Sequence, residues 1–202
     1  MDACDSDLLP LLPHPQMPGG AVRRVAARAW LAAPQSLRLR YLLEADPRRI
    51  RIPAAVPGGG RADRLWTHTC FEAFVGVDGS AGYLELNFSP SGQWAAYRFE
   101  SYREGTAPAA LEEPPAMAIM PGKKGLELRA EVRLRGALPG RERSTAGVVA
   151  GRGGMRIALS TVVEDEEGRL SYWALRHPPG RPDFHHPDSF SLALAFSPDP
   201  HS

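Results

Sequence analysis

Apolar and polar residues alternate along much of the chain in short runs, which is the pattern of β-strands that bury one face. Between Leu126 and Leu134 every even-numbered residue is apolar and every odd-numbered residue is Glu or Arg. Charged side chains along one face of a strand are usually solvated. We therefore interpret this run as a strand with an ordinary solvent-facing side.

Similar runs predict ten strands, separated by turns that draw on the chain's 20 prolines and 20 glycines. The predicted strands are 22–31, 37–43, 70–77, 83–88, 94–100, 117–120, 126–134, 155–163, 170–176 and 190–196. No stretch has the periodicity of an amphipathic helix, and no segment repeats at a fixed period. The sequence predicts an all-β fold, a two-sheet antiparallel β-sandwich of immunoglobulin-like or jelly-roll-like type, with a small closed barrel as the alternative.

The chain length of 202 residues is that of one domain. We expect a single β-sandwich domain over residues 21–197, a flexible N-terminal segment over residues 1–20 and a flexible tail over residues 198–202. The stretch from Pro53 to Arg64 contains three consecutive glycines and is predicted to be a loop.

Composition excludes several classes of function. The formal net charge is +1 and basic runs such as Arg48 to Ile52 are short, so we expect no nucleic-acid partner. The two cysteines, Cys4 and Cys70, have neither the spacing of a zinc site nor that of a disulfide framework. The N-terminal residues lack the pattern of a secretory signal, and no window approaches 18 uninterrupted apolar residues. We therefore expect a cytoplasmic protein that does not contact a membrane.

The predicted strand from Tyr83 to Phe88 carries polar side chains opposite its core residues. Its even-numbered residues are apolar, which places Glu85 and Asn87 on the other face. The same alternation places Glu72 opposite the apolar stripe of the preceding strand. Since a Pro-Ser-Gly turn and a short glycine-containing turn join these strands to their neighbours, we expect consecutive antiparallel pairing that gathers the polar residues on one face.

The following strand is expected to bury Tyr97 and Phe99 in the core and to place Trp94 and Arg98 on the polar face. In the last predicted strand, the residues opposite the core stripe are small: Ser191, Ala193 and Ala195. A face with carboxylates, an amide, aromatic rings and a floor of small residues offers room and hydrogen-bonding groups for a ligand.

Sugars fit this set of groups, because their hydroxyl edges bond to carboxylates and amides while their C–H faces stack on aromatic rings. We therefore predict a non-catalytic binding protein for a small polar ligand, most plausibly a saccharide, with no cofactor and no metal. The candidate ligand-binding residues are Trp66, Glu72, Glu85, Asn87, Trp94, Arg98, Tyr102, Arg103, Trp173, His177, Asp183 and His185.

Other readings of the same residues remain open. Glu72 and Glu85 would form an internal charge network if they paired with Arg98, Arg103 or Arg176. As a carboxylate pair at about 5 to 9.5 Å they would suit a hydrolase or lyase of sugar-like substrates. A protein-interaction module is a further alternative.

Metal ligation is an alternative that the spacing supports less well. His68, Cys70 and Glu72 alternate along one strand face, and a proline-rich loop adds Asp183, His185 and His186. Such a mixed set of donors suits a transition metal, but it matches no closed zinc pattern. Cys70 as a nucleophile is disfavoured because its apolar neighbours predict burial.

Three runs resemble bacterial DOMON-like proteins related to carbohydrate-binding module family 9: LWTHTCFEAFVG, YLELNFSPSGQWAAYRFESYREG and LSYWALRHPPGRPDFHHPDSFSLAL. The resemblance extends over residues 22–196. The residues that match the family pattern in order and spacing are Trp66, Cys70, Glu72, Glu85, Asn87, Ser89, Pro90, Trp94, Tyr97, Phe99, Tyr102 and Arg103.

This resemblance implies a β-sandwich whose relatives bind sugars or, in other DOMON branches, haem. Haem ligation by Met and His does not transfer, because Met117, Met120 and Met155 lie outside the strong motif. Family 9 modules bind sugars with a pair of aromatic rings and nearby polar groups, and Trp66, Trp94 and Trp173 are the candidates for these rings here. Their calcium sites have no Asp-rich counterpart in this sequence.

Overall fold

The computed structural model describes residues 5–33, 35–139 and 154–195 of the chain. Its strands are β1 (Leu9–Pro13), β2 (Val22–Ala33), β3 (Ser36–Ala45), β4 (Gly60–Arg61), β5 (Cys70–Val77), β6 (Tyr83–Phe88), β7 (Gln93–Phe99), β8 (Ala107–Pro108), β9 (Ala116–Gly122), β10 (Gly125–Arg133), β11 (Gly154–Glu164), β12 (Leu170–Ala174) and β13 (Leu192–Ala195). Three 3-10 turns, η1 (Asp5–Asp7), η2 (Leu65–Thr67) and η3 (Pro187–Ser189), are the only helical elements in these ranges. The prediction of an all-β fold is confirmed.

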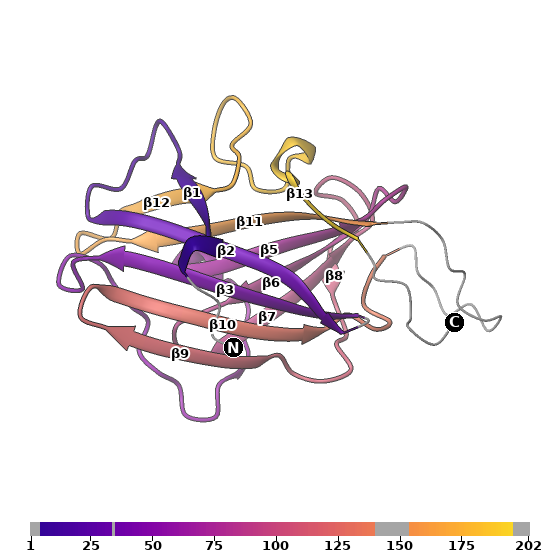
Figure 1. Cartoon of the computed structure of the whole chain (residues 1–202), viewed down its shortest axis with the longest axis horizontal. Helices are drawn as coiled ribbons and strands as arrows, with labels where there is room; N and C mark the ends of the chain where they lie inside the picture. Colours follow the sequence, from indigo (N-terminus) through magenta and orange to yellow (C-terminus); the bar gives the residue numbers. More distant parts are fainter. Residues whose placement is uncertain (1–4, 34, 140–153, 196–202) are drawn as a thin grey trace.

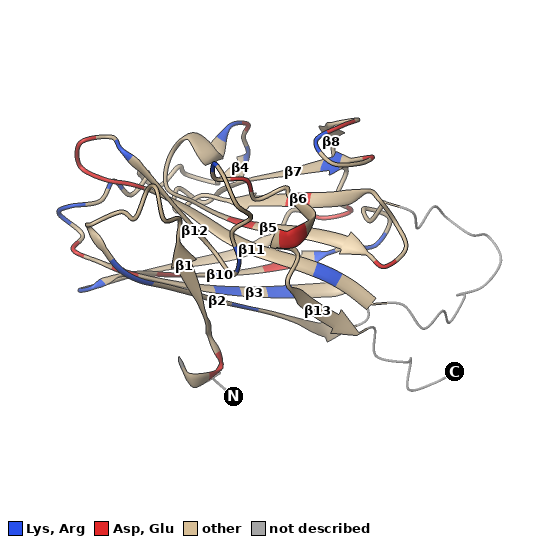
Figure 2. Ribbon diagram, turned by 90° about the horizontal axis from the view of Figure 1, so that it is seen from above, with Lys and Arg blue, Asp and Glu red and all other residues tan. Residues whose placement is uncertain are grey.

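The strands form one continuous sheet in the order β4-β7-β6-β5-β11-β12-β1-β2-β3-β10-β9, with β8 paired to β7 and β13 paired to β11. All pairs are antiparallel except β4 with β7. The sheet curls so that β2, β3 and β10 lie in one layer and β5, β6 and β7 in the other (Figures 1 and 2). Two separate sheets are not confirmed, because β1 joins the layers.

β1 lies within the segment that we expected to be flexible. Leu9 to Leu11 pair with β2, while Leu12 and Pro13 pair with β12. The side chain of Leu11 is buried in the core. Proline has no backbone N–H to donate within a sheet, so a run that contains prolines does not indicate a strand in the sequence.

The main core lies between the two layers and consists of the alternate apolar side chains of each strand. The Tyr41 ring of β3 lies 5.2 Å from the Phe71 ring of β5, centroid to centroid. The Tyr41 hydroxyl donates a 2.6 Å hydrogen bond to the backbone carbonyl of Glu72. This packing fixes β5, so that the other face of β5 is held as a rigid floor.

The opposite face of the β3 and β10 layer carries the charged residues of the Leu126 to Leu134 run (Figure 2). Arg40 forms a two-pronged ion pair with Glu127, and Arg38 pairs with Glu131. This agrees with the interpretation of these charges as an exposed strand face. Within the described residues, no helix is long and apolar enough to cross a membrane.

Candidate functional site

A cleft of ≈ 600 Å³ lies over the face of β5, β6, β7, β11 and β12 that points away from the core. Loops cover its sides: η2, the segment after β7 and the proline-rich segment before η3. Its lining residues are Trp66, Thr67, Glu72, Phe74, Glu85, Tyr97, Phe99, Arg103, Thr106, Val162, Leu170, Tyr172, Phe184 and His185. Five of the twelve candidate residues from the sequence are among them: Trp66, Glu72, Glu85, Arg103 and His185.

Two carboxyl groups form the floor of the cleft. Glu72 is 3% exposed and Glu85 is 6% exposed. Their strands are paired so that Glu72 is opposite Asn87 and Phe74 is opposite Glu85. The two glutamates are therefore diagonal neighbours on one face of the sheet, and their charges repel each other.

Glu72 is short of hydrogen-bond partners. Among the residues that the structure describes, its buried Oε1 atom has no hydrogen-bond partner, and its Oε2 atom has only the Ser160 hydroxyl, 3.5 Å away. A buried oxygen without a donor costs free energy, about 1–3 kcal/mol and more for a charged group. Glu72 thus has an unsatisfied buried oxygen, and its side chain is among those that line a cleft large enough for a small ligand.

Glu85 has more hydrogen-bonding and ionisable partners than Glu72. The Asn87 side-chain amide donates a 2.7 Å hydrogen bond to its Oε1 atom. Its Oε2 atom lies 3.8 Å from Nε2 of His185. Nδ1 of His185 lies 2.9 Å from the Tyr83 hydroxyl, which itself accepts the backbone N–H of Arg103. In the tautomer in which the Tyr83 O–H donates to Nδ1, the His185 proton is on Nε2, on the side of Glu85.

Burial controls the protonation of these groups. Burial first, and then the nearby Glu85 charge, hold the pKa of Glu72 well above its usual range. Burial also raises the pKa of Glu85, against the opposing effects of the Asn87 hydrogen bond and of Arg103. Burial, with the Arg103 charge as a second cause, lowers the pKa of His185 to about 4. At neutral pH the imidazole is neutral, and both carboxyl groups keep their protons to a higher pH than a solvated glutamate does.

Aromatic rings form the walls of the cleft. Trp66, at the rim and 39% exposed, meets Tyr97 edge to face at 5.8 Å between ring centroids. The Tyr97 hydroxyl donates a 2.7 Å hydrogen bond to Asp63. Burial and this bond raise the pKa of Tyr97 to about 12. Opposite, the rings of Phe74 and His185 lie 4.9 Å apart. The walls are therefore rigid apolar surfaces with few polar atoms of their own.

Arg103 is held at the cleft by Asp183. Nη2 of Arg103 lies 2.8 Å from Oδ1 of Asp183, and the Tyr102 hydroxyl donates to the other carboxylate oxygen. Arg103 has a left-handed backbone, with φ of +58°, which a non-glycine residue adopts only when its surroundings hold it. Tyr102 and Asp183 therefore position Arg103 from outside the cleft.

The alternation expected for β7 is wrong by one residue. Phe88 pairs with Trp94, and Glu85 pairs with Tyr97, so Tyr97 shares the face of Glu85. Because five residues separate Phe88 from Trp94, even-numbered residues of β6 pair with even-numbered residues of β7 and lie on the same face of the sheet. Trp94 consequently packs on the main core, and Arg98 is exposed on the side away from the cleft.

Two further candidates from the sequence lie elsewhere. Trp173 is opposite Thr161 in the sheet and is buried in the main core, whereas its neighbour Tyr172 lines the cleft. The His177 side chain, at Nε2, lies 2.9 Å from the carbonyl of Leu12, because β1 runs beside this segment. Burial lowers the pKa of His177.

The small residues of β13 do not floor the cleft. β13 pairs with the start of β11, from Gly154 to Ile157, while Glu72 is opposite Ser160 further along that strand. Phe190 also departs from the expected core stripe, since it packs near Phe74 on the cleft side of the sheet. Phe196, the expected end of this strand, lies outside the described residues.

The charge-network reading of the two glutamates is not supported. In the described ranges, neither Glu72 nor Glu85 has an Arg or Lys within ion-pair distance. The same ranges contain no group of three or more His, Cys, Asp or Glu residues arranged for a metal. His68 was a candidate metal ligand, but its Nδ1 atom lies 2.6 Å from Oε2 of Glu164.

The glycine-rich loop before β4 leaves the cleft uncovered. It packs against the turn after β6, where a Cβ on Gly59 would lie 2.4 Å from the carbonyl oxygen of Gly92. Gly59 also has a positive φ of +58°. Only glycine permits this close approach, which anchors β4 beside β7 at the edge of the sheet.

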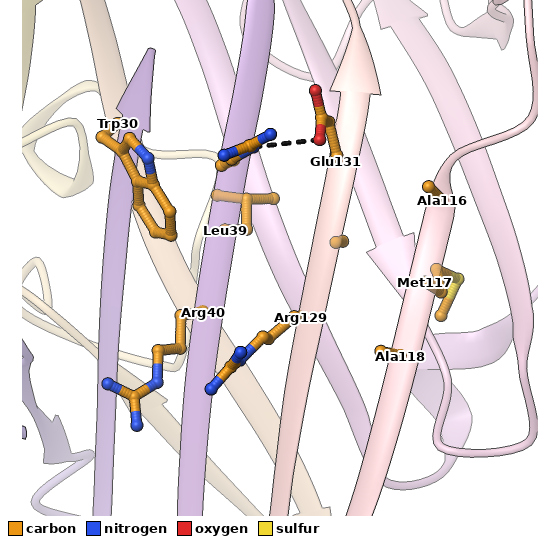
Figure 3. Close-up of a pocket in the computed structure, with 10 residues that line it drawn as sticks. Trp30, Leu39, Arg40, Ala116, Met117, Ala118, Arg129 and Glu131 are labelled. Carbon is orange, nitrogen blue, oxygen red and sulfur yellow. Dashed lines mark hydrogen bonds and ion pairs between the residues drawn. The ribbon is translucent and has the colours of Figure 1, made fainter. Parts of the chain in front are cut away.

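A second depression, of ≈ 360 Å³, lies on the outer face of β2, β3, β10 and β9 (Figure 3). Trp30, Arg40 and Arg129 project into it, and Glu131 bonds to Arg38 at its edge. Its charged groups satisfy one another, since Glu127 accepts from both Arg40 and Arg129. It lacks the unsatisfied buried acceptor that marks the first cleft, which makes it the weaker candidate.

No protein-family model matches the chain, and no curated protein matches it. Solved structures do match it. A proposed carbohydrate-binding protein from Bacteroides uniformis superposes with a TM-score of 0.67 at 17% identity, over 94% of this chain and 86% of that one. A family 9 carbohydrate-binding module from Caldicellulosiruptor kristjanssonii, solved with glucose, gives a TM-score of 0.52 at 9% identity, over 100% of this chain and 91% of that one. At these identities the likeness is one of fold alone, and the chain shares its fold with these two structures.

Proposed function

We propose that this protein binds a saccharide in the cleft above Glu72 and Glu85, without catalysing a reaction. The observation that carries the proposal is the buried, unpartnered Oε1 atom of Glu72 at the floor of a cleft with aromatic walls. A sugar hydroxyl would supply the missing donor, and the C–H faces of the ring would pack on Trp66 or Tyr97.

The fold likeness adds support from a second direction. One neighbour is a proposed carbohydrate-binding protein, and the other is a family 9 carbohydrate-binding module that was solved with glucose. From this likeness and from the resemblance of the sequence motifs, we propose that the curled sheet is a variant of the DOMON-like β-sandwich related to family 9 modules. A cytoplasmic location is part of the same proposal, as is a single domain that includes β1 together with residues 21–197.

Isothermal titration with glucose, N-acetylglucosamine, glucosamine and cellotriose tests the function. We expect at least one of these sugars to bind the wild-type protein, and Glu85→Gln to weaken that binding at least tenfold. Glu127→Gln, on the outer face of the other layer, is the matched control and should leave binding unchanged. If none of the sugars binds, or if both variants bind alike, the proposal is wrong.

A carboxylate-dependent hydrolase is the second candidate, favoured by one observation: two buried carboxyl groups are neighbours on one face of the sheet, and burial raises the pKa of each, as a general acid requires. Incubation with nitrophenyl glycosides distinguishes it from simple binding. Release of nitrophenol that is lost in both Glu72→Gln and Glu85→Gln would establish the enzyme. Release that survives both changes would exclude these residues as catalysts.

A further inference from the structure

The cleft has an unbalanced charge. Glu72 and Glu85 are both buried carboxyl groups, and no Lys or Arg ion pair within the described part of the chain balances either one. The only basic side chain among the lining residues with a permanent charge is Arg103, and its partner is Asp183. The neutral His185 adds no charge. A fully ionised floor would therefore hold two negative charges with no cation of its own.

The aromatic walls of the cleft favour a positively charged ligand, as the uncompensated carboxyl groups of the floor do. Phe74, Phe99, Tyr172 and Tyr97 line the cleft with aromatic rings, and Trp66 stands at the rim. Aromatic faces attract cations by about 0.5–2 kcal/mol, depending on desolvation. A ligand with a positive group would therefore meet favourable surfaces both at the floor and along the walls.

Resting on the saccharide-binding function proposed above, we propose that the ligand is an amino sugar, whose protonated amino group bonds to Oε1 of Glu72. An ammonium group has three N–H donors, so one can satisfy the orphaned Oε1 while the others remain for Glu85 or the Ser160 hydroxyl. The ring hydroxyls then face His185 and Arg103, two polar side chains that also line the cleft.

Binding of a cation should displace a proton from the carboxyl pair. In the free protein, burial raises the pKa of both carboxyl groups, and the Glu85 charge raises that of Glu72 further, so their protonated forms are favoured. An ammonium group beside Glu72 stabilises the ionised form, so the carboxyl O–H bond breaks and its proton passes to the buffer. The ligand keeps its own proton, and the net step is the release of protons from the protein.

The other ionisable groups around the pair do not titrate between pH 6 and 7. Cys70 on β5, Tyr83 on β6, Tyr97 on β7, Tyr172 on β12 and Tyr41 from the opposite layer all have pKa values raised by burial. In the covering loops, burial would raise the pKa of Asp183, but the hydrogen bonds from Tyr102 and Arg103 outweigh it and lower that pKa. Burial would lower the pKa of Arg103, but its interaction with Asp183 outweighs it and raises that pKa. The His185 pKa is lowered to about 4. Proton release in this interval therefore reports on Glu72 and Glu85.

Calorimetric titration of the full chain with glucosamine and N-acetylglucosamine, at pH 6 to 7, tests the inference. The two sugars share one ring, but only glucosamine carries a positive charge. We expect glucosamine to bind at least tenfold more tightly, with a heat that changes between buffers of different ionisation enthalpy because protons are released. Glu72→Gln should abolish the preference and the proton release, so that glucosamine binds to this variant no more tightly than N-acetylglucosamine does.

The outcomes separate this inference from the function on which it rests. If N-acetylglucosamine or glucose binds as tightly as glucosamine, the cleft is a saccharide site without a cation subsite, and the inference is wrong. If no sugar binds, the proposed function fails as well. If putrescine, an amine without a sugar ring, binds as tightly as glucosamine, the site recognises amines alone and the inference is again overturned. Glu127→Gln should match wild type in each titration.

Discussion

The Tyr41 hydroxyl, on one layer of the curled sheet, donates a 2.6 Å hydrogen bond to the backbone carbonyl of Glu72 on the other layer. Tyr41 is 0% exposed and its ring packs on Phe71. The bond crosses the core directly beneath the residue that forms the floor of the cleft. It therefore connects the stability of the fold with the position of Glu72.

Tyr41→Phe removes this bond and keeps the ring. We expect the free energy of unfolding to fall by about 1 kcal/mol, the usual net value of a buried hydrogen bond. Urea denaturation measures the change. Tyr102→Phe is the control, because its exposed hydroxyl bonds to Asp183 at the surface and should contribute less. Equal effects of the two substitutions would show that the bond across the core does not stabilise the fold.

The carboxyl of Glu72 should make the unliganded protein less stable as the pH rises. Its pKa in the folded state is raised by burial, whereas an unfolded Glu titrates near about 4.3. Between these values the folded state holds a proton that the unfolded state has released, so stability falls with increasing pH. Glu72→Gln removes this dependence, and we expect the variant to gain stability over wild type from pH 5 to pH 8, measured by urea denaturation.

Glu127→Gln provides a contrast of opposite sign. Hydrogen bonds from Arg40 first, and also from Arg129, lower the pKa of Glu127. The stability that this carboxylate contributes is present above the unfolded pKa and is lost as the pH falls through the folded one. The variant should therefore be less stable than wild type at pH 8, and the difference should shrink in acid. A gain in stability at pH 8 for Glu127→Gln, or a loss for Glu72→Gln, would contradict the assignment.

His185 should destabilise the protein in acid. Its pKa falls from the ordinary 6.5 to about 4 on folding, because burial disfavours the charged ring. Stability is therefore present above pH 6.5 and is lost as the pH falls towards 4, by up to about 3 kcal/mol. We expect His185→Gln to gain stability over wild type between pH 7 and pH 5, in thermal denaturation. The same dependence of stability on pH in His185→Gln and in wild type would contradict this assignment.

The strands of the fold could be predicted because their apolar side chains alternate. β5 and β6 have the predicted bounds, and all ten predicted strands overlap an observed one. The alternation also identified Glu72, Glu85 and Asn87 as residues opposite the core. β1, β4 and β8 were missed, because a Leu-Pro run and two-residue strands have too few side chains to show a period.

The walls of the cleft could be predicted less well. β7 has apolar residues on both faces, so hydrophobicity alone does not say whether Trp94 or Tyr97 faces the core. The number of residues in the turn after Phe88 decides it, and this is a signal that the sequence contains. By contrast, the positions of His177 and Trp173 depend on β1, which joins the layers through long-range pairing that no local pattern reveals.

Paired substitutions in β7 test which of its faces contacts the ligand. Tyr97→Ala removes a ring that lines the cleft, so we expect binding of the tightest sugar from the calorimetric panel to weaken at least tenfold. Trp94→Ala removes a ring that packs on the core; it should cost about 2 kcal/mol of folding stability and leave the Kd within about twofold. If Trp94→Ala abolishes binding in a sample that remains folded by circular dichroism, while Tyr97→Ala does not, the ligand binds elsewhere than in this cleft.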